Sequence, residues 1–392
     1  MQTSDFWQNF VNKQVTFRYM RQELQFKLSQ SLFSSADVDI GSRFLLRTIA
    51  KKMEITHFSS MLDIGCGVGV LGLSLKRINS NIQLLAQDRD ALAATFTAQN
   101  AVLNELDGVV AQGGLAFDDV GEQKFDLIVS NLPGKAGQAV LQDILHRMPT
   151  YLSKTGMAAV VIVKPLAELV AETLAKMESE ILLREEASGY EVFHFRGGNL
   201  AQAGTEQGLE PYIRNEQAFK MGKKSVEMQT AWNLPEFDSL AHDTTLAINA
   251  LKKKPVSGRV MFWNPRQGHL PVFLREQVDE FVLAGRDGLS LQMAEMNLKR
   301  VGGGKVTQQH IPYFLEASGQ YDWLIIFPDM DPGVTWENYL LPHCRDLLVT
   351  GGQLLLVAKS AYTHRLLQKK RGLHSKFDRK RNGYRAVILT KA

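Results

Sequence analysis

Cysteine and long apolar segments are scarce in this chain of 392 residues. The two cysteines, Cys66 and Cys344, lie far apart in the sequence, so they provide neither a disulfide framework nor a cluster of metal ligands. The N-terminus has no basic segment followed by an apolar one, and no apolar run approaches the roughly 18 residues of a membrane span. We therefore expect a cytoplasmic protein without a metal or a membrane segment.

The chain has no strong excess of either charge, with 45 Lys and Arg against 41 Asp and Glu and a formal net charge of +4. This mildly basic balance fits an anionic partner, but it also fits many proteins with neutral substrates. The length exceeds what one hydrophobic core usually organises, so it predicts at least two domains.

The first half of the chain alternates between strand and helix patterns. Apolar residues at every second position in 15–33 predict an antiparallel pair of strands. Further strands are expected near 61–62, 82–86, 127–129 and 157–163, and helices at 41–53, 71–78, 91–103 and 138–152. Strands separated by helices of this length predict a largely parallel sheet covered on both faces, which is a doubly wound, Rossmann-like α/β fold.

The second half echoes the first at an offset of roughly 195 to 205 residues. Four matches occur in the same order, at 33–45 and 237–246, 125–129 and 321–325, 155–156 and 350–351, and Lys164 and Lys359. Any one of them fits chance similarity, but four in order predict two tandem copies of one fold. We expect a first domain at 1–190, a connection or insertion at 191–230, and a second copy at 231–392.

A glycine-rich turn, Asp63-Ile64-Gly65-Cys66-Gly67-Val68-Gly69, follows one predicted strand and precedes a helix. Glycines there let the backbone turn sharply and approach a ligand closely. The spacing G-x-G-x-x-G from Gly67 to Gly72 also fits a dinucleotide-binding protein. The acid before the first glycine favours a sulfonium cofactor instead, because Asp63 can face its charged methionine end.

Two further positions follow neighbouring strands. Asp88 would accept hydrogen bonds from both ribose hydroxyls of a cofactor, and the alternative is a solvated loop acid. The strand at 125–129 ends in Ser130-Asn131-Leu132-Pro133-Gly134. An Asn oxygen and a neighbouring backbone carbonyl can accept both hydrogens of an amine whose lone pair must leave ring conjugation. The alternative for this sequence is an ordinary turn.

Together, Phe33-Ser34 through Asp39-Ile40-Gly41-Ser42, the glycine turn, Asp88 and Ser130–Pro133 resemble the methyltransferase small-domain family. The likeness covers roughly 15–170 and is greatest to ribosomal RNA guanine-N2 methyltransferases built from two fused copies of the fold. It implies S-adenosyl-L-methionine as cofactor, ribosomal RNA as partner and a monomer. It assigns catalysis to Asn131, Leu132, Pro133 and Gly134, and cofactor binding to Asp63, Gly65, Cys66, Gly67, Gly69, Asp88 and Asn131.

Three positions depart from the family pattern. Leu132 replaces a proline, and Gly134 replaces an aromatic residue that would stack on the target base. Gly113-Gly114 offers no acid where many relatives hold the adenine amine. These departures keep two alternatives open, an amino-group methyltransferase acting on adenine N6 or protein glutamine, and a non-catalytic RNA-binding platform with a vestigial cofactor site. A nicotinamide dehydrogenase is a minor fourth option, since no paired acid and base are found.

The second copy has other residues at both motifs. Phe262–Gly268 stands where the glycine turn is expected, and Phe327-Pro328-Asp329 stands where Asn131 is expected. This predicts that the second domain is degenerate and binds substrate or serves as a scaffold. In the related two-copy enzymes the degenerate copy comes first, whereas here it comes second. Its segment 365–385 contains nine Lys and Arg with three aromatic or His side chains among them, as in proteins that bind single-stranded RNA. The alternative is a solvated surface.

Overall fold

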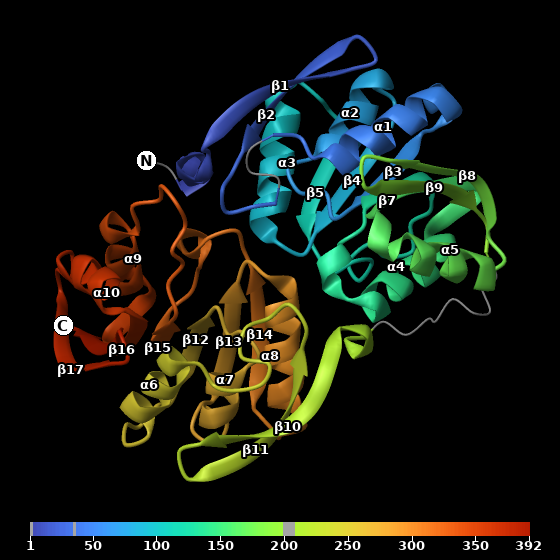
Figure 1. Cartoon of the computed structure of the whole chain (residues 1–392). Coiled ribbons are helices and arrows are strands. Elements are labelled where there is room, and N and C mark those ends of the chain that lie inside the picture. The colour runs from blue at the N-terminus through green and yellow to red at the C-terminus, as the bar shows by residue number, and fades with distance from the viewer. Residues whose placement is uncertain (1–2, 34–36, 199–207) are drawn as a thin grey trace. The chain divides into compact units, whose positions relative to one another are not determined.

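The computed structural model describes residues 3–33, 37–198 and 208–392, and these form two compact domains, Ser4–Tyr212 and Ile213–Ala392 (Figure 1). Each domain contains one seven-stranded sheet and one two-stranded sheet. None of the helices in this described part of the chain is long and apolar enough to cross a membrane.

The first domain is built on a mixed sheet with the strand order β5-β4-β3-β6-β7-β9-β8. Its first five members are parallel, and β9 pairs with β7 and β8 in antiparallel register. The strands are β3 (Ser60–Ile64), β4 (Gln83–Asp88), β5 (Val109–Gly113), β6 (Phe125–Asn131), β7 (Leu152–Val163), β8 (Glu180–Ala187) and β9 (Tyr190–Arg196). The helices are α1 (Ile40–Lys52), α2 (Val70–Ile78), α3 (Ala91–Leu103), α4 (Gln138–Tyr151) and α5 (Ala167–Lys176).

The predicted hairpin precedes this sheet and is attached to α3. Strands β1 (Lys13–Tyr19) and β2 (Gln22–Leu28) pair antiparallel, as expected from the alternating apolar residues. Two asparagines stand in for a third strand: Asn100 of α3 bonds both backbone groups of Lys27, and Asn104, the C-cap of α3, bonds both of Gln25. These bonds satisfy backbone groups that a free strand edge would leave to water.

The second domain repeats this architecture strand for strand, in the order β14-β13-β12-β15-β16-β18-β17. Its sheet comprises β12 (Arg259–Trp263), β13 (Glu280–Gly285), β14 (Lys305–His310), β15 (Tyr321–Ile326), β16 (Leu348–Lys359), β17 (Leu373–Arg381) and β18 (Tyr384–Lys391). Its helices are α6 (His242–Leu251), α7 (His269–Leu274), α8 (Gly288–Arg300), α9 (Leu340–Leu347) and α10 (Ser360–Leu367). The prediction of two tandem doubly wound α/β domains is therefore confirmed.

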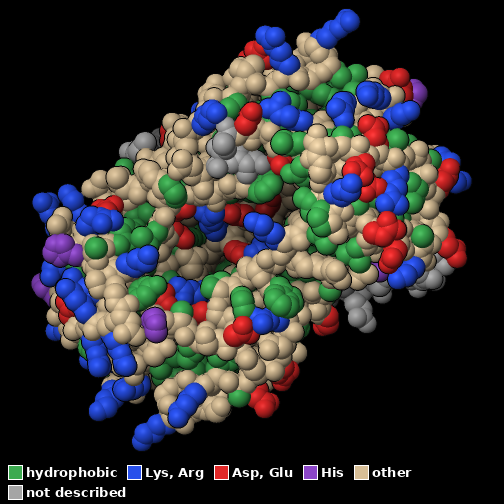
Figure 2. Space-filling model, viewed as in Figure 1, with side chains coloured by type: hydrophobic (Ala, Val, Ile, Leu, Met, Phe, Trp, Pro, Cys, Tyr) green, Lys and Arg blue, Asp and Glu red, His purple; other side chains and the backbone are tan. Residues whose placement is uncertain are grey.

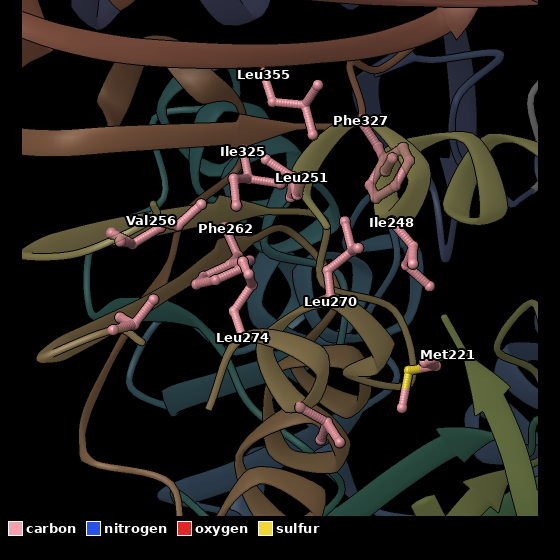
Figure 3. Packing of buried hydrophobic residues seen from close by; sticks show 14 of the residues in the cluster. Met221, Ile248, Leu251, Val256, Phe262, Leu270, Leu274, Ile325, Phe327 and Leu355 are labelled. Carbon is pink, nitrogen blue, oxygen red and sulfur yellow. The ribbon is translucent and has the colours of Figure 1, made fainter. Parts of the chain in front are cut away.

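The asparagine attachment is also repeated in the second domain. Its hairpin comprises β10 (Ile213–Met221) and β11 (Lys224–Ala231), and Asn297 of α8 bonds both backbone groups of Gln229. The core beside this hairpin packs Met221, Ile248 and Leu270 with residues of the central strands (Figure 3). The repeat therefore extends to side chains that hold the elements together.

Two sequence expectations differ from the structure. Thr155-Gly156 and Thr350-Gly351 lie within the irregular strands β7 and β16 rather than before them. The segment 191–230 contains more regular structure than expected of a connection: its first residues complete β9, and Ile213–Ala231 forms the second domain's hairpin. The polar composition of the hairpin hid it in the sequence, because a hairpin exposes one face to water. In the motif from Phe33 to Ser42, Ser34 and Ser35 lie outside the described residues.

Candidate active site

The register of three parallel strands brings the predicted residues to one edge of the first sheet. Ile64 at the end of β3 lies opposite Gln87 of β4 on one side and Ser130 of β6 on the other. The residues that follow are Gly65, Asp88 and Asn131, which therefore form a row at the carboxyl ends of the strands. Ligands of open α/β sheets bind at this edge.

The glycine turn leaves open space on its ligand side. Gly65, Gly67 and Gly69 have φ angles of 72°, 57° and 90°, the left-handed region that glycine adopts without strain. A Cβ atom on Gly65 or Gly67 would meet nothing within 4 Å, whereas one on Gly69 would lie 2.7 Å from Leu73. The first two glycines thus border the space for a ligand, and the third permits packing against α2.

Cys66 points away from this space. Its side chain is buried, Thr97 donates a hydrogen bond to its sulfur at 3.4 Å, and burial raises the pKa of the thiol well above its ordinary value. Its backbone N–H, like that of Gly65, donates to the carbonyl of Gln87. Any contribution of Cys66 to ligand binding is therefore made by its backbone.

Asp88 connects the glycine turn to the start of α3. Its Oδ2 accepts a hydrogen bond from the Gly67 N–H at 3.0 Å, and its Oδ1 accepts one from the Asp90 N–H at 2.9 Å. The carboxylate is partly exposed at the sheet edge. Its two oxygens are thus oriented beside the open side of the turn, as a carboxylate that receives ribose hydroxyls requires.

Asp63 lies beneath the turn with one oxygen unsatisfied. The side chain is 1% exposed, and its Oδ2 accepts a hydrogen bond from the Gly72 N–H at 2.9 Å. Its Oδ1 has no hydrogen-bond partner among the described residues. Burial raises the pKa of Asp63 from 3.8 to about 7, although the Gly72 bond lowers it. A buried carboxyl oxygen without a partner is costly and fits a positively charged ligand.

The raised pKa predicts how the stability of the first domain depends on pH. Folded Asp63 keeps its proton up to about pH 7, whereas an unfolded Asp releases it near its ordinary pKa of 3.8. Its contribution to the free energy of unfolding is therefore present at low pH and is lost as pH rises from about 4 to about 7. We expect Asp63→Asn to remove this loss. Urea unfolding between pH 5 and pH 8, monitored by hydrogen exchange of the β3 amides, measures the free energy of unfolding of both proteins. The same dependence on pH in both proteins would contradict this role of Asp63.

Asn131 is held in one orientation at the end of β6. Its Nδ2 donates to Asp39 Oδ2 at 2.7 Å and to Ser42 Oγ at 3.2 Å. Because a carboxylate only accepts hydrogen bonds, the atom facing Asp39 is the amide nitrogen. The Oδ1 atom is therefore turned away from Asp39 and is the acceptor atom of this side chain.

The carboxylate that holds Asn131 also begins α1. Asp39 is the N-cap of α1, and its Oδ2 accepts the Ser42 N–H at 3.0 Å. Sequence analysis noted Asp39 and Ser42 only as part of a motif, and their contacts to Asn131 explain why the motif belongs to the site. The hydroxyl of Tyr190 donates to Asp39 Oδ1 at 3.4 Å, a contact that no sequence signal predicted.

The residues after Asn131 have different surroundings. Leu132 is 4% exposed, so its side chain packs inside the domain and only its backbone is available to a substrate. Pro133 is exposed. A Cβ on Gly134 would lie 3.3 Å from Leu166 and 3.4 Å from Val163, so this position backs onto the apolar end of β7.

An acid lies near the expected adenine position after all. Gly114 donates its N–H to the Asp88 carbonyl, and a Cβ on Gly114 would lie only 2.7 Å from Asp119 Oδ2. Asp119 itself is exposed. The acid is not recognisable at Gly113-Gly114 in the sequence, because Asp119 follows Gly114 by five residues and the loop folds back to bring its carboxylate there.

The second domain keeps the shape of the turn but fills it. Asn264, Arg266 and Gly268 have φ angles of 56°, 56° and 90°, at the positions of the three glycines. Asn264 Nδ2 donates to Asp329 Oδ1 and to the Phe327 carbonyl, both at 2.9 Å. Arg266 pairs with Asp243 at 2.7 Å and lies over the Phe327 ring at 4.2 Å. Register places Gly285 where the first domain has Asp88, so no ribose carboxylate stands there.

Comparison with known proteins defines the class of the first domain. Residues 23–194 match the model of the family described as methyltransferase small domain. The first domain is therefore similar to the methyltransferase small-domain family over most of its length, as its motifs predicted, and the cofactor expected of it is S-adenosylmethionine. The two open glycines and the unpartnered Asp63 oxygen fit such a cofactor, whose methionine end is cationic.

Two relatives each match less than half of this chain. Over 157 residues the chain is 32% identical to "Ribosomal RNA small subunit methyltransferase C" of Actinobacillus pleuropneumoniae, covering 39% of this chain and 46% of that protein. It is 29% identical over 182 residues to the uncharacterised protein YbxB of Bacillus subtilis, covering 46% and 89% of the two chains. The chain thus spans just under half the length of the ribosomal RNA methyltransferases it matches.

One solved structure shares the whole fold. The Thermus thermophilus 16S rRNA N2 G1207 methyltransferase, described in complex with AdoMet and guanosine, superposes with a TM-score of 0.64 and covers 100% of both chains at 17% identity. At this identity the likeness shows the fold alone. It confirms the two-domain architecture predicted from the internal repeat.

Proposed function

We propose that the first domain transfers a methyl group from S-adenosylmethionine to the exocyclic N2 of a guanine in ribosomal RNA. The observation that carries this proposal is the fixed amide of Asn131, whose acceptor oxygen lies in the same row of strand ends as Gly65 and Asp88. The names of the ribosomal RNA relatives and the guanosine complex of the structural neighbour support this choice of substrate.

Each cofactor-binding residue has a defined task in this proposal. Asp63 neutralises the cationic methionine end, and Asp88 accepts the ribose hydroxyls. Gly65 and Gly67 admit the cofactor close to the backbone because they have no side chain to exclude it. Asp119 is placed to accept the adenine amine, beside Gly114. The bound cofactor supplies an electrophilic methyl group.

The amine is prepared for attack by acceptors of this chain. An exocyclic amine of guanine is a weak nucleophile because its lone pair is conjugated with the ring. Asn131 Oδ1 and the Leu132 carbonyl accept its two hydrogens, which favours a pyramidal nitrogen with the lone pair free. With the cofactor bound, the nitrogen would form its bond to the methyl carbon as the bond from that carbon to sulfur breaks, leaving the sulfur as a neutral thioether, and the nitrogen would then release one proton to water. Fixed positioning supplies much of the remaining rate.

The absence of an aromatic side chain at Gly134 favours a second candidate, an amino-group methyltransferase acting on adenine N6 or protein glutamine. Incubation of the protein with tritiated cofactor and separate RNA, DNA and protein fractions distinguishes these substrates. Label in RNA, recovered as N2-methylguanosine by mass spectrometry, is the expected result. Label confined to protein or DNA would overturn the guanine assignment, and no cofactor binding in calorimetry would favour the non-catalytic platform.

We further propose that the second domain binds the RNA backbone through its edge strand β17. This strand is exposed over most of its length and contains Lys376, Arg379, Lys380 and Arg381. Its one acid, Asp378, is bound by Arg385 of β18 at 2.8 Å. Figure 2 shows Lys and Arg side chains gathered over this edge of the second domain. A hollow of about 300 Å³ lined by Arg345, Lys369 and Arg371 adds further positive charge.

The equivalent strand of the first domain has the opposite charge. Strand β8 contains Glu180, Glu185 and Glu186 with the single cation Arg184. Both strands end their sheets, so a generally solvated edge does not account for the difference. Positive charge on only one copy indicates a function in binding an anion.

Reversing three charges of β17 is expected to weaken RNA binding. Replacing Arg379, Lys380 and Arg381 by Glu should raise the Kd for ribosomal RNA about 100-fold and reduce the slope of log Kd against log salt by roughly 2, because each phosphate contact contributes about 0.7 to 0.9. Fluorescence anisotropy across a salt series measures both. The exposed lysines Lys154, Lys176 and Lys223, replaced together by Glu, are the control. Equal weakening in both variants would contradict a role specific to β17.

A further inference from the structure

Strand β9 places an aromatic residue beside the active site, although position 134 has none. Tyr190 begins β9 and pairs with Val163, the last residue of β7. Val163 is the residue whose side chain would lie 3.4 Å from a Cβ on Gly134. Tyr190 therefore stands one strand away from the motif that follows Asn131.

The hydroxyl of Tyr190 reaches the carboxylate that orients Asn131. Asp39 Oδ1 accepts the Tyr190 O–H at 3.4 Å, while Asp39 Oδ2 accepts Asn131 Nδ2 at 2.7 Å and the Ser42 N–H at 3.0 Å. The three bonds divide the two oxygens between separate partners. A carboxylate held on both oxygens cannot rotate without breaking one of these bonds.

Gly41 makes the approach of Tyr190 possible. It lies in the first turn of α1 and, unlike the glycines of the cofactor turn, is not among the residues with a positive φ. A Cβ there would lie 2.8 Å from the Tyr190 ring and 2.9 Å from Asp39 Oδ2. Glycine in a helix costs roughly 0.5–1 kcal/mol relative to alanine, so the space for this ring is the reason for glycine at this position.

The second domain provides an internal comparison. Tyr384 begins β18 and pairs with Lys359 of β16, the same register as Tyr190 and Val163. The N-cap of α6 is Ala241, whose side chain cannot accept a hydrogen bond. The tyrosine is thus present in both copies. The N-cap carboxylate that links it to Asn131, at the end of β6, is present only in the first copy.

We propose that Tyr190 is a positioning residue for methyl transfer, acting through Asp39 to hold the Asn131 amide in its productive orientation. This inference rests on the proposed amino-group chemistry of Asn131. The Tyr190 hydroxyl supplies the hydrogen bond, and Gly41 supplies the space.

Tyr190→Phe removes only the hydroxyl and is expected to lower kcat about tenfold, while KM for RNA, the Kd of the cofactor and Tm stay unchanged. A tenfold change corresponds to about 1.4 kcal/mol, in the range of one hydrogen bond to a charged group. Gly41→Ala should lower kcat at least as much, because its Cβ would displace both the Tyr190 ring and Asp39 Oδ2. Combining the two should cost no more than the larger single effect. Tyr321→Phe in the second domain, which removes a hydroxyl bonded to Ser318 and Gln309, is the control and should retain full activity.

A second readout does not depend on methyl transfer. The side-chain amide of Asn131, assigned in a nitrogen–proton NMR spectrum by its loss in Asn131→Ala, should shift and exchange faster with water in Tyr190→Phe and Gly41→Ala but not in Tyr321→Phe. An unaltered Asn131 signal, or kcat within twofold of the unmodified protein, would overturn the role of Tyr190. Altered amide signals in a protein that methylates no RNA would instead refute the proposed function alone.

Discussion

Asn131→Ala is expected to lower kcat for methyl transfer by roughly 100- to 1,000-fold, the cost of removing one acceptor that acts on the reacting group in the transition state. Cofactor affinity should change by less than about twofold, because Asp63, the glycine turn and Asp88 are bonded to one another independently of Asn131. The loss therefore appears in the chemical step and not in binding.

Single-turnover methyl transfer to RNA, with calorimetry of cofactor binding, measures the two effects separately. Asn249→Ala in α6 of the second domain is the control, since it removes an amide that donates only to the Thr245 carbonyl of its own helix. An Asn131→Ala protein that methylates RNA at the normal rate would refute the proposed acceptor. Loss of cofactor binding in the same variant would show that Asn131 belongs to the cofactor site instead.

Gly65→Asn is expected to abolish cofactor binding while the domain remains folded. The second domain shows that Asn adopts this backbone conformation, because Asn264 occupies the equivalent position with φ of 56°, against 72° for Gly65. A side chain on Gly65 would project into space that contains no protein atom within 4 Å of its Cβ. Because we propose that the cofactor binds in that space, we expect its Kd to rise at least 100-fold, or about 2.7 kcal/mol.

Gly121→Asn provides the control for backbone strain. Gly121 has φ of 70° and open space around a Cβ, but lies in the loop between β5 and β6. It should lose the same small amount of stability as Gly65→Asn and bind the cofactor normally. Thermal unfolding and calorimetry of the two variants give both quantities. Normal cofactor affinity in Gly65→Asn would place the ligand away from the turn.

The sequence predicted those parts of the fold where a local residue pattern fits only one kind of structure. The helix at 91–103 has the bounds expected, and the glycine turn lies between β3 and α2 because left-handed backbone and close packing both require glycine. The repeat was recognisable because buried strands such as 125–129 and 321–325 must remain apolar in both copies.

The parts that sequence did not predict depend on long-range contacts. Strand β8 is exposed and rich in Glu, so its sequence resembles a loop, and only pairing with β9 makes it a strand. Tyr190 reaches Asp39 across a sequence separation of 151 residues, which no motif spans. Asn131 could be proposed from its motif, but its orientation depends on Asp39, which is 92 residues away.

Because side chains fill the turn of the second domain, we expect the stabilities of the two domains to depend differently on the concentration of the cofactor. When a domain binds a small molecule only in its folded state, its free energy of unfolding increases with the concentration of that molecule. The second domain closes its own turn with Asn264 and Arg266, so its folding free energy is independent of cofactor supply. Under the proposed function, depletion of the cofactor lowers the stability of the first domain and leaves that of the second domain unchanged.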